Sequence, residues 1–504
     1  MVTLIKNVML FDGGARPPFK ADVLVRDDAI LALGIFPNYK ADRVINGNDG
    51  YLTPGFIDVD AGSDRYLTVF TAPAHRDFVS QGITTILMGH CGFSLAPTLY
   101  GKLEHFFNWS RKDAVNVNWR GVGELLGVLE KRPLNVNVAT LVGHKVMRED
   151  ILKNPAEFRK LTANELRVLR SLLAMSLDEG AFGLSSGLGY FPYQDTPYHE
   201  LRALLDVVHE HRGIYTTHLR NEREQLAQAV EETIKLAQET AVPTIISHLR
   251  PFIGFEEEYR KALSLIEGKT AKADVYFDIN PFDASAVALD TLLPVALQHR
   301  DRGAALECLK DKSVARDVSA TLPDIDAKDI TILNAPEMEF LNGKTLFEFA
   351  QNRGLGTRAA LLSLMEVTKL RGVVFYRNLN QEEVDRALFS ERALISTNSP
   401  SFDDLLTFKP ERSYKTFPTF LERATGKMPL EKAVARVTGT PARILGLERR
   451  GFVSGGYAAD LVLLSRDLAV SMVMVNGVVT VENGKAVEGV RSSGRILRRV
   501  AGRA

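Results

Sequence analysis

The sequence predicts an α/β protein with a (β/α)8, TIM-like barrel and a small β-sandwich domain built from both chain ends. Three observations lead to this prediction. Strands and helices alternate through the middle of the chain, both ends have strand patterns, and polar side chains follow the predicted barrel strands. We expect the β-sandwich to comprise residues 1–53 and 447–504, and the barrel to comprise residues 54–446.

The middle of the chain alternates between short strand patterns and helical stretches. Two helix starts carry local signals: Thr162-Ala-Asn-Glu165 has the spacing of a capping box, and Thr196-Pro197 places a proline at the first helical position. A mostly helical insertion around residues 290–390 separates the last two strands and is expected over the barrel mouth. The predicted barrel strands are 55–60, 83–88, 135–142, 181–185, 213–218, 243–248, 273–279 and 392–397.

Both chain ends alternate between apolar and polar residues as β-strands do. The pair Asn476-Gly477 lies between two such runs and is a strong hairpin signal. Two strand-rich ends around a long barrel indicate one small domain that both ends share. The predicted strands of this domain are 3–10, 22–25, 30–33, 459–464, 472–477 and 478–481.

Composition excludes several classes of function. The 504 residues contain 62 basic and 62 acidic side chains, so charge gives no case for binding nucleic acid or an anionic membrane. The start of the chain lacks the features of a signal peptide. Two cysteines, Cys91 and Cys308, build no disulfide framework and suit a reducing cytoplasm. Cys308 lies in a helical pattern and is expected to be a buried thiol. The oligomeric state stays open, with a homo-oligomer as one option.

Reactive residues follow the predicted strands, at the ends where such barrels carry their chemistry. Cys91 is flanked by Gly89 and Gly92, while His218 and His248 each end an apolar strand. A single histidine or cysteine after a strand is more often structural, but three at strand ends favour a metal site. A thiolate and two imidazoles suit zinc, with a fourth position left for water. The strand-end residues in order are Asp60, Asp64, Cys91, His144, Tyr190, His218, His248, Asp278 and Asn398.

Several segments resemble one known family along essentially the whole chain. The chain resembles the N-acyl-D-amino-acid deacylases, or D-aminoacylases, of the amidohydrolase superfamily. This resemblance implies a metallohydrolase barrel with a β-sandwich, and hydrolysis of a linear amide such as an N-acyl amino acid. The segments are Thr53-Pro-Gly-Phe-Ile-Asp-Val, Gln81-Gly-Ile-Thr-Thr, Gly89-His-Cys-Gly-Phe-Ser-Leu-Ala-Pro97, Leu141-Val-Gly-His144, Glu179-Gly-Ala-Phe-Gly-Leu-Ser-Ser-Gly-Leu188, Tyr215-Thr-Thr-His-Leu-Arg220, Ile246-Ser-His248 and Pro441-Ala-Arg-Ile-Leu-Gly446.

The resemblance implies one tightly bound zinc ion, because the family's Cys and two His ligands match Cys91, His218 and His248. The family's weaker second metal uses a His-x-His pair and an acid after the last strand. Asp60, Gly62 and Asn398 stand at those three positions here. The missing acid is the family's catalytic acid/base, and the Asn398 amide cannot carry its proton. Asp60 or Asp64 could replace it as ligand or base. Asp64 matches an Asp that the family already has.

The resemblance also implies a small-molecule substrate with a carboxylate. Arg412 matches the family's carboxylate-binding Arg, and Arg250 stands where the family has a Lys that contacts substrate. Tyr190 matches a Tyr of the family, whereas Phe282 and Ala286 replace a Tyr and a Ser. The alternative for Arg250 and Arg412 is an ordinary surface or salt-bridge role.

Three functions therefore remain open at the level of the sequence. The first is a zinc-dependent hydrolase of N-acyl amino acids that uses one metal. The second is a catalytically impaired homologue that binds a carboxylate ligand or acts in an assembly. The third is a hydrolase of a different bond, with a site rebuilt around Asp60. Asn398 discriminates between the first two, because the enzyme needs a substitute acid within reach and the binding protein needs none.

Overall fold

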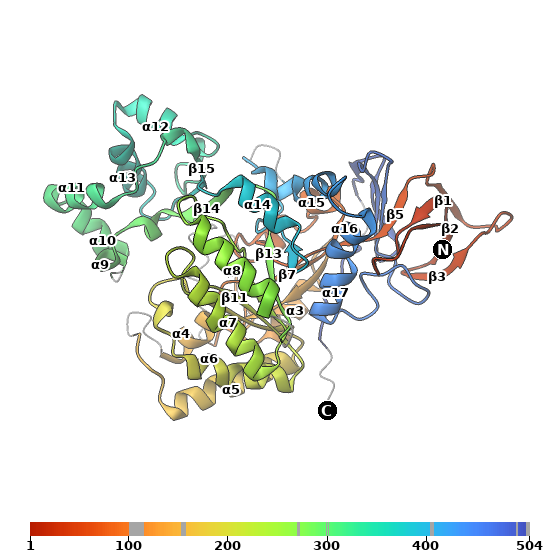
Figure 1. Ribbon diagram of the computed structural model, residues 1–504, viewed down its shortest axis with the longest axis horizontal. Helices are drawn as coiled ribbons and strands as arrows, with labels where there is room; N and C mark the ends of the chain where they lie inside the picture. The colour runs from red at the N-terminus through yellow and green to blue at the C-terminus, as the bar shows by residue number, and fades with distance from the viewer. Residues whose placement is uncertain are drawn as a thin grey trace.

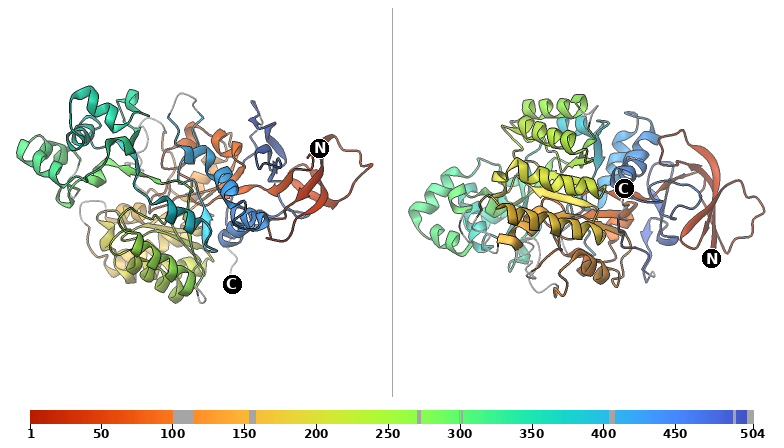
Figure 2. Two further views of the ribbon diagram at one scale, coloured as in Figure 1. Left: turned by 45° about the horizontal axis from the view of Figure 1, so that its top comes forward. Right: turned by 90° about the horizontal axis from the view of Figure 1, so that it is seen from below.

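The computed structural model describes residues 1–99, 115–152, 158–269, 273–298, 300, 302–403, 408–489 and 492–499. A sheet made by both chain ends lies on one side of the molecule. Parallel strands with surrounding helices form the middle, and a group of helices projects from the opposite side (Figure 1). The turned views show the same arrangement (Figure 2).

The parallel strands of the middle form two sheets with the orders β6-β7-β8 and β9-β10-β11-β12-β13-β17. Every residue of β7 and β11 is buried, as expected for strands covered on both faces. Each predicted barrel strand overlaps a strand of these sheets. The bounds are β6 Phe56–Asp58, β7 Ile83–Met88, β8 Asn137–Thr140, β9 Val142–Gly143, β10 Gly183–Gly187, β11 Ile214–His218, β12 Thr244–Ile246, β13 Val275–Ile279 and β17 Ala393–Ile395.

Backbone hydrogen bonds link the two parallel sheets at both of their edges. Strands β8 and β9 are separated only by Leu141, and the Phe182 N–H before β10 donates to Thr140 O at 2.9 Å. At the other edge, the Asn398 N–H after β17 donates to Asp60 O after β6, also at 2.9 Å. The carboxyl ends of the first and last parallel strands therefore lie side by side.

Helices connect and cover the parallel strands. Helix α5 begins with the predicted capping box, in which the Glu165 N–H donates to Thr162 Oγ1 and Glu165 reaches back to the Thr162 N–H. Pro197 is the N-cap of α6, one residue before the predicted position. The bounds are α1 Thr68–Thr71, α2 Arg76–Ser80, α3 Val122–Leu129, α4 His144–Leu152, α5 Ala163–Asp178, α6 Tyr198–Glu210, α7 Leu226–Thr240, α8 Glu256–Lys269, α14 Gln381–Leu388, α15 Glu411–Ala424, α16 Leu430–Val437 and α17 Gly439–Leu445.

The segment between β13 and β17 holds its own apolar cluster, which includes Leu289, Phe349, Leu361 and Val374. It contains the expected helices, but also a small sheet of order β14-β16-β15 that the helical pattern concealed. The prediction that Cys308 is buried is wrong: it is partly exposed in α10 and accepts a hydrogen bond from Arg300. The bounds are β14 Ala284–Ala288, α9 Val295–Gln298, α10 Arg302–Leu309, α11 Lys312–Thr321, β15 Ile330–Asn334, α12 Leu346–Arg353, α13 Thr357–Val367 and β16 Val373–Arg377.

Strands from the two chain ends form one mixed sheet with the order β21-β20-β19-β18-β5-β1-β2-β3, and β4 pairs with β1. The antiparallel pair β5–β18 joins the two ends. Asn476 and Gly477 have positive φ values of 46° and 80° between β19 and β20, which confirms the predicted hairpin. The bounds are β1 Val2–Leu10, β2 Phe19–Arg26, β3 Ala29–Gly34, β4 Arg43–Asn46, β5 Tyr51–Pro54, β18 Leu461–Leu464, β19 Val470–Val475, β20 Val478–Glu482 and β21 Lys485–Ala486.

A buried polar network fastens this mixed sheet to the parallel strands. Asn137 of β8 donates to Asp460 Oδ2 at 3.0 Å and accepts from Asn476 Nδ2 at 2.7 Å. Arg450 forms an ion pair with Asp460 and donates to Asn476 Oδ1 at 2.9 Å. The four side chains satisfy one another's hydrogen-bonding groups where water has little access.

We predict that Arg450→Met lowers the free energy of unfolding by about 3–5 kcal/mol, because Asp460 keeps its buried charge without a cationic partner. Arg495→Met is the matched control, since the Arg495 side chain pairs with Asp28 where both are half-exposed and such pairs contribute about 1 kcal/mol or less. Urea unfolding of both variants measures the free energies of unfolding. Equal decreases in the two variants would contradict the prediction.

Within the described part of the chain, no helix is both long and apolar enough to cross a membrane.

Candidate metal centre

Cys91, His218 and His248 converge at the carboxyl ends of three parallel strands. Cys91 follows β7, His218 ends β11, and His248 follows β12. One potential ligand atom from each lies within 4.8 Å of the other two, and all three residues are buried. The Cys91 Sγ is 3.2 Å from His248 Nε2. The three residues that the sequence predicted as metal ligands therefore lie close together.

The electrostatics of this cluster favour a thiolate. Burial raises the pKa of the Cys91 thiol, but the positive charges of His248 and Arg65 outweigh burial and hold the pKa well below its usual range. Burial and Arg250 lower the pKa of His248, but the Cys91 thiolate and Glu222 raise it to about 10. Without a metal, Cys91 and His248 therefore form a thiolate–imidazolium pair. A metal cation can replace the imidazolium proton and keep the charge balanced.

Asp60 and Asn398 lie beside the cluster and are hydrogen-bonded to each other. Asn398 Nδ2 donates to Asp60 Oδ2 at 2.9 Å, and His90 Nδ1 is 3.9 Å from Asp60 Oδ1. Burial raises the pKa of Asp60, but the charges of His90, His248 and Arg65 outweigh it, so the pKa is lower than usual. Asp60 is therefore ionised at neutral pH. Its hydrogen-bond donor, Asn398, is the residue that the resemblance aligns with the family's catalytic acid.

Three other strand-end residues make hydrogen bonds within the fold. The Asp64 carboxylate accepts the backbone N–H groups of Gly89 and Arg65, each at 2.8 Å, so it braces the ends of β6 and β7. His144 Nε2 contacts Glu200 at 2.8 Å. Asp278 accepts the hydroxyl of Ser396 at 2.5 Å. Asp64 and His144 thus make structural contacts. The second oxygen of Asp278 is buried without a hydrogen-bond partner among the described residues, and Asp278 lies close enough to His248 for their charges to interact.

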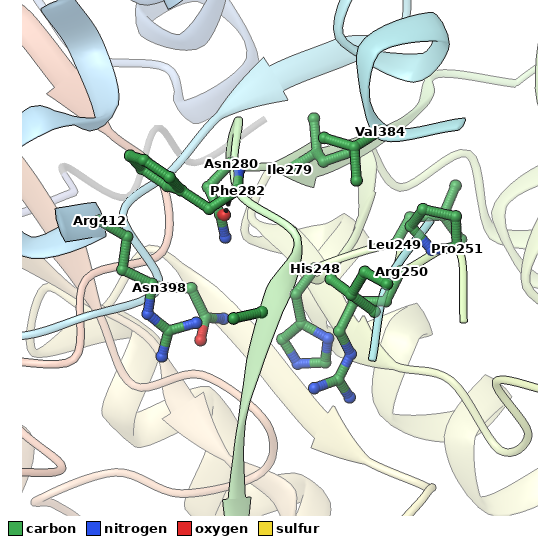
Figure 3. Close-up of a pocket in the computed structure, with 12 residues that line it drawn as sticks. His248, Leu249, Arg250, Pro251, Ile279, Asn280, Phe282, Val384, Asn398 and Arg412 are labelled. Atoms are coloured by element: carbon green, nitrogen blue, oxygen red, sulfur yellow. Dashed lines mark hydrogen bonds between the residues drawn. The ribbon is translucent and has the colours of Figure 1, made fainter. Parts of the chain in front are cut away.

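A pocket opens beside the metal cluster, with His248 and Arg250 on one side and Asn398 and Arg412 on the other (Figure 3). Arg412 comes from the first turn of α15 and is 5% exposed, and its Nε has no hydrogen-bond partner among the described residues. Its guanidinium lies 4.5 Å from the centre of the Phe375 ring. Burial lowers the pKa of Arg412 to about 10, so it is still cationic at neutral pH.

The remaining predicted substrate residues lie next to the histidines. The Tyr190 ring centre is 4.6 Å from that of His218. Arg250 does not face the pocket as a free cation: its Nε and Nη2 donate to the two oxygens of Glu222 at 3.1 and 2.5 Å. Phe282, which replaces a family tyrosine by the resemblance, lines the pocket.

Two charged residues of this site, Glu222 and Arg65, were not predicted from the sequence. Glu222 lies four residues after His218 in the loop that follows β11, and Arg65 follows Asp64. The spacing His218-Leu-Arg-Asn-Glu222 was the available signal. A carboxylate four residues after a candidate ligand histidine can contact the ring of that histidine.

Comparisons with known proteins show the family of this chain. An Amidohydrolase family model matches residues 395–480. N-acyl-D-aspartate deacylase of Alcaligenes xylosoxydans xylosoxydans is 31% identical over 481 residues, which cover 91% of this chain and 85% of that protein. This chain belongs to the N-acyl-D-amino-acid deacylase family. The resemblance that the sequence motifs predicted is thereby confirmed.

Solved structures of the deacylase family superpose on nearly the whole chain. N-acyl-D-glutamate deacylase from Bordetella bronchiseptica, complexed with zinc and a phosphonate mimic of the tetrahedral intermediate, has a TM-score of 0.80 and 26% identity, and the match covers 98% of this chain and 99% of that one. A D-aminoacylase studied for one-metal activation and second-metal attenuation of its binuclear centre has a TM-score of 0.79 and 27% identity, with 99% of both chains covered.

We predict that Asn398→Asp makes stability fall as pH rises. The new carboxyl group would lie about as close to Asp60 as the present 2.9 Å hydrogen bond, so the two would share a proton and one pKa would rise above the unfolded value of about 4. The native state then binds more protons than the unfolded state between about pH 4 and the raised pKa. Across that window the free energy of unfolding falls by about 1.4 kcal/mol for each pH unit.

Unfolding free energies of metal-free protein, measured as a function of pH, check this prediction. Asn398→Ala is the control, because it removes the amide donor without adding a charge. A pH dependence of Asn398→Asp that parallels the control would contradict the shared proton.

Proposed function

We propose that this protein hydrolyses the amide bond of N-acyl-D-amino acids, with one zinc ion held by Cys91, His218 and His248. The observation that carries the proposal is the convergence of a thiol and two imidazoles, all buried, within 4.8 Å. The related N-acyl-D-aspartate and N-acyl-D-glutamate deacylases support the substrate class. The zinc complex of the latter supports the choice of metal.

We also infer that the two parallel sheets are arcs of one closed (β/α)8 barrel. The hydrogen bonds from Phe182 to Thr140 and from Asn398 to Asp60 support closure at both edges. We infer that the mixed sheet bends to form the β-sandwich of residues 1–53 and 447–504. Its core would be the buried apolar cluster that includes Val23 of β2, Leu52 of β5 and Met474 of β19. The site would then lie at the carboxyl end of the barrel, where such enzymes place their chemistry.

The residues fit zinc by their chemistry. Cys91 favours the thiolate form, and His218 Nδ1 is buried with no hydrogen-bond partner in the described part of the chain. Bound there, zinc supplies Lewis-acid activation of the amide carbonyl and of the attacking water. A second metal is not expected, because Asp60 and Asn398 satisfy each other. A side chain at Gly62 would place its Cβ 3.2 Å from the backbone of Ser399.

Arg412 is the side chain placed to bind the substrate carboxylate. It is buried, it lines the pocket, and its Nε lacks a hydrogen-bond partner among the described residues. A carboxylate that accepts two parallel N–H bonds from a guanidinium is fixed in orientation as well as in position. Tyr190, whose ring packs on His218, lies beside the proposed metal ligands.

Asp60 is the group placed to move a proton. Its lowered pKa keeps it ionised, so it can take a proton from the attacking water and return it to the leaving nitrogen. Asn398 cannot titrate, but its amide fixes one Asp60 oxygen and leaves the other to react. Asp64 remains a weaker candidate for this role, because backbone N–H groups occupy both of its oxygens.

A catalytically impaired binding protein is the second candidate, and the substitution of the family's acid by Asn398 is the observation behind it. The relatives, which are named as deacylases, do not favour it. A hydrolase of a different bond, rebuilt around Asp60, is the third. An assay with matched N-acetyl-D- and N-acetyl-L-amino acids separates them, since only the proposed enzyme releases acetate from the D series.

We predict that purified protein holds about one zinc ion per chain, and that Cys91→Ala abolishes binding because the only charged ligand of the three is lost. Elemental analysis after zinc-replete expression and dialysis measures the stoichiometry. Cys308→Ala is the matched control, since this thiol lies in α10 of the separate helical cluster. Absence of zinc from the wild type would refute the proposal.

We predict that Arg412→Met raises KM for N-acetyl-D-amino acids by about 10- to 100-fold, as expected for loss of a charge-assisted hydrogen bond of about 1.5–3 kcal/mol. Asp60→Asn should instead lower kcat by about 10²–10⁴, because it removes the proton acceptor. Steady-state kinetics of both variants distinguishes the two roles. A fall in kcat alone for Arg412→Met would contradict its assignment to carboxylate binding.

A further inference from the structure

Glu222 contacts both histidines of the metal cluster with a single carboxylate. Its Oε2 is 3.1 Å from His218 Nε2, and its Oε1 is 3.5 Å from His248 Nδ1. The carboxylate side chain is only 17% exposed. A buried acid that touches two potential metal ligands at once is placed to control both of them.

Glu222 lies against one nitrogen of each imidazole, and the opposite nitrogens are His218 Nδ1 and His248 Nε2. In His248 the other nitrogen, Nε2, is the one 3.2 Å from Cys91 Sγ. In His218 the other nitrogen, Nδ1, is buried. Neither it nor His248 Nδ1 makes a hydrogen bond within the described residues, so the 3.5 Å approach of Glu222 to His248 is an ion-pair contact. A neutral imidazole carries one proton, so the nitrogen that donates to a carboxylate leaves a lone pair on the opposite nitrogen.

Arg250 holds Glu222 in this position. The guanidinium donates through Nε and Nη2 to the two carboxylate oxygens, a bidentate contact that fixes the plane of the carboxylate. The same guanidinium lies 5.2 Å from the centre of the Phe252 ring, which limits its own movement. The orientation of Glu222 is therefore fixed by a guanidinium that contacts both of its oxygens.

We propose that Glu222 is a positioning residue that selects the metal-binding tautomer of both histidines. It takes the N–H of His218 Nε2 and of His248 Nδ1, so that His218 Nδ1 and His248 Nε2 present their lone pairs toward Cys91. Arg250 acts through Glu222 and supports the metal centre, which differs from the grip on substrate carboxylate that the sequence predicted for it. This inference rests on the proposed metal site.

The test compares zinc affinity of the full-length variants Glu222→Gln and Glu232→Gln by competition with a chromogenic chelator. Glutamine keeps the shape of Glu222, but its amide can donate to a histidine nitrogen and so favours the wrong tautomer. We expect Glu222→Gln to lose about 10- to 100-fold in affinity. Glu232 is the matched control, because it makes the same bidentate contact with Arg220 at 3.0 and 2.9 Å. The Glu232→Gln affinity should match that of the wild type.

The cobalt-substituted protein gives a readout that general loss of stability does not move. Glu222→Gln should keep the thiolate-to-cobalt charge-transfer band, because Cys91 remains, but should shift the ligand-field bands. The double variant Glu222→Gln with Arg250→Met removes both buried charges and so guards against misfolding of the single variant. Its zinc affinity should stay as low as that of Glu222→Gln.

Two outcomes would overturn the inference, and they are distinguishable. If either Glu222 variant binds zinc as tightly as the wild type with an unchanged cobalt spectrum, while Cys91→Ala does not bind, Glu222 does not position the ligands and the proposed function stands. If the wild type takes up no zinc, the inference falls together with the proposed metal site.

Discussion

The pairing of buried charges is the constraint on which the rest of this site depends. The Cys91 thiolate, the carboxylates of Asp60 and Glu222, and the guanidinium groups of Arg65, Arg250 and Arg412 lie near the carboxyl ends of the parallel strands, and an isolated buried charge costs several kcal/mol. Cys91 is therefore opposed by His248, and Glu222 by Arg250. The pocket stays open on the Arg412 side, where a guanidinium nitrogen has no hydrogen-bond partner among the described residues. An anionic substrate would pair with Arg412, in the same way that the charged side chains of the site pair with one another.

Two departures from the family are chemically one change. The resemblance places an imidazole at position 60 and a carboxylate at position 398, whereas this chain has the carboxylate at Asp60 and an amide at Asn398. The two side chains are joined by a 2.9 Å hydrogen bond. In this chain the carboxylate of the pair therefore follows the first parallel strand, at Asp60, whereas the resemblance places it after the last strand, at position 398. Under the proposed one-metal site, this exchange would remove the ligands of a second metal ion while it keeps one ionised carboxylate in the site.

The parts of the structure that follow from local pattern could be predicted from the sequence. Cys91, His218 and His248 were identifiable because each follows a short apolar strand, and parallel strands bring their carboxyl ends to one edge. Glu222 could not be placed, because the conformation of the loop after β11 decides where its carboxylate points. Strands β14, β15 and β16 were missed because they are short apolar runs among stronger helical patterns, and their pairing is not local.

The mixed sheet constrains the order in which the chain can fold. Arg43 and Glu482 form an ion pair although they are 439 positions apart, and β5 reaches the strands of the other end only through β18. During synthesis the strands β1–β5 leave the ribosome first, but β18, the partner of β5, is made only after residue 460. Their apolar residues, such as Ile5, Leu10 and Leu52, must stay uncovered or sheltered in the meantime. This sheet can be completed only after β18 has been made, so a chain that ends before β18 leaves β5 without a partner on one edge.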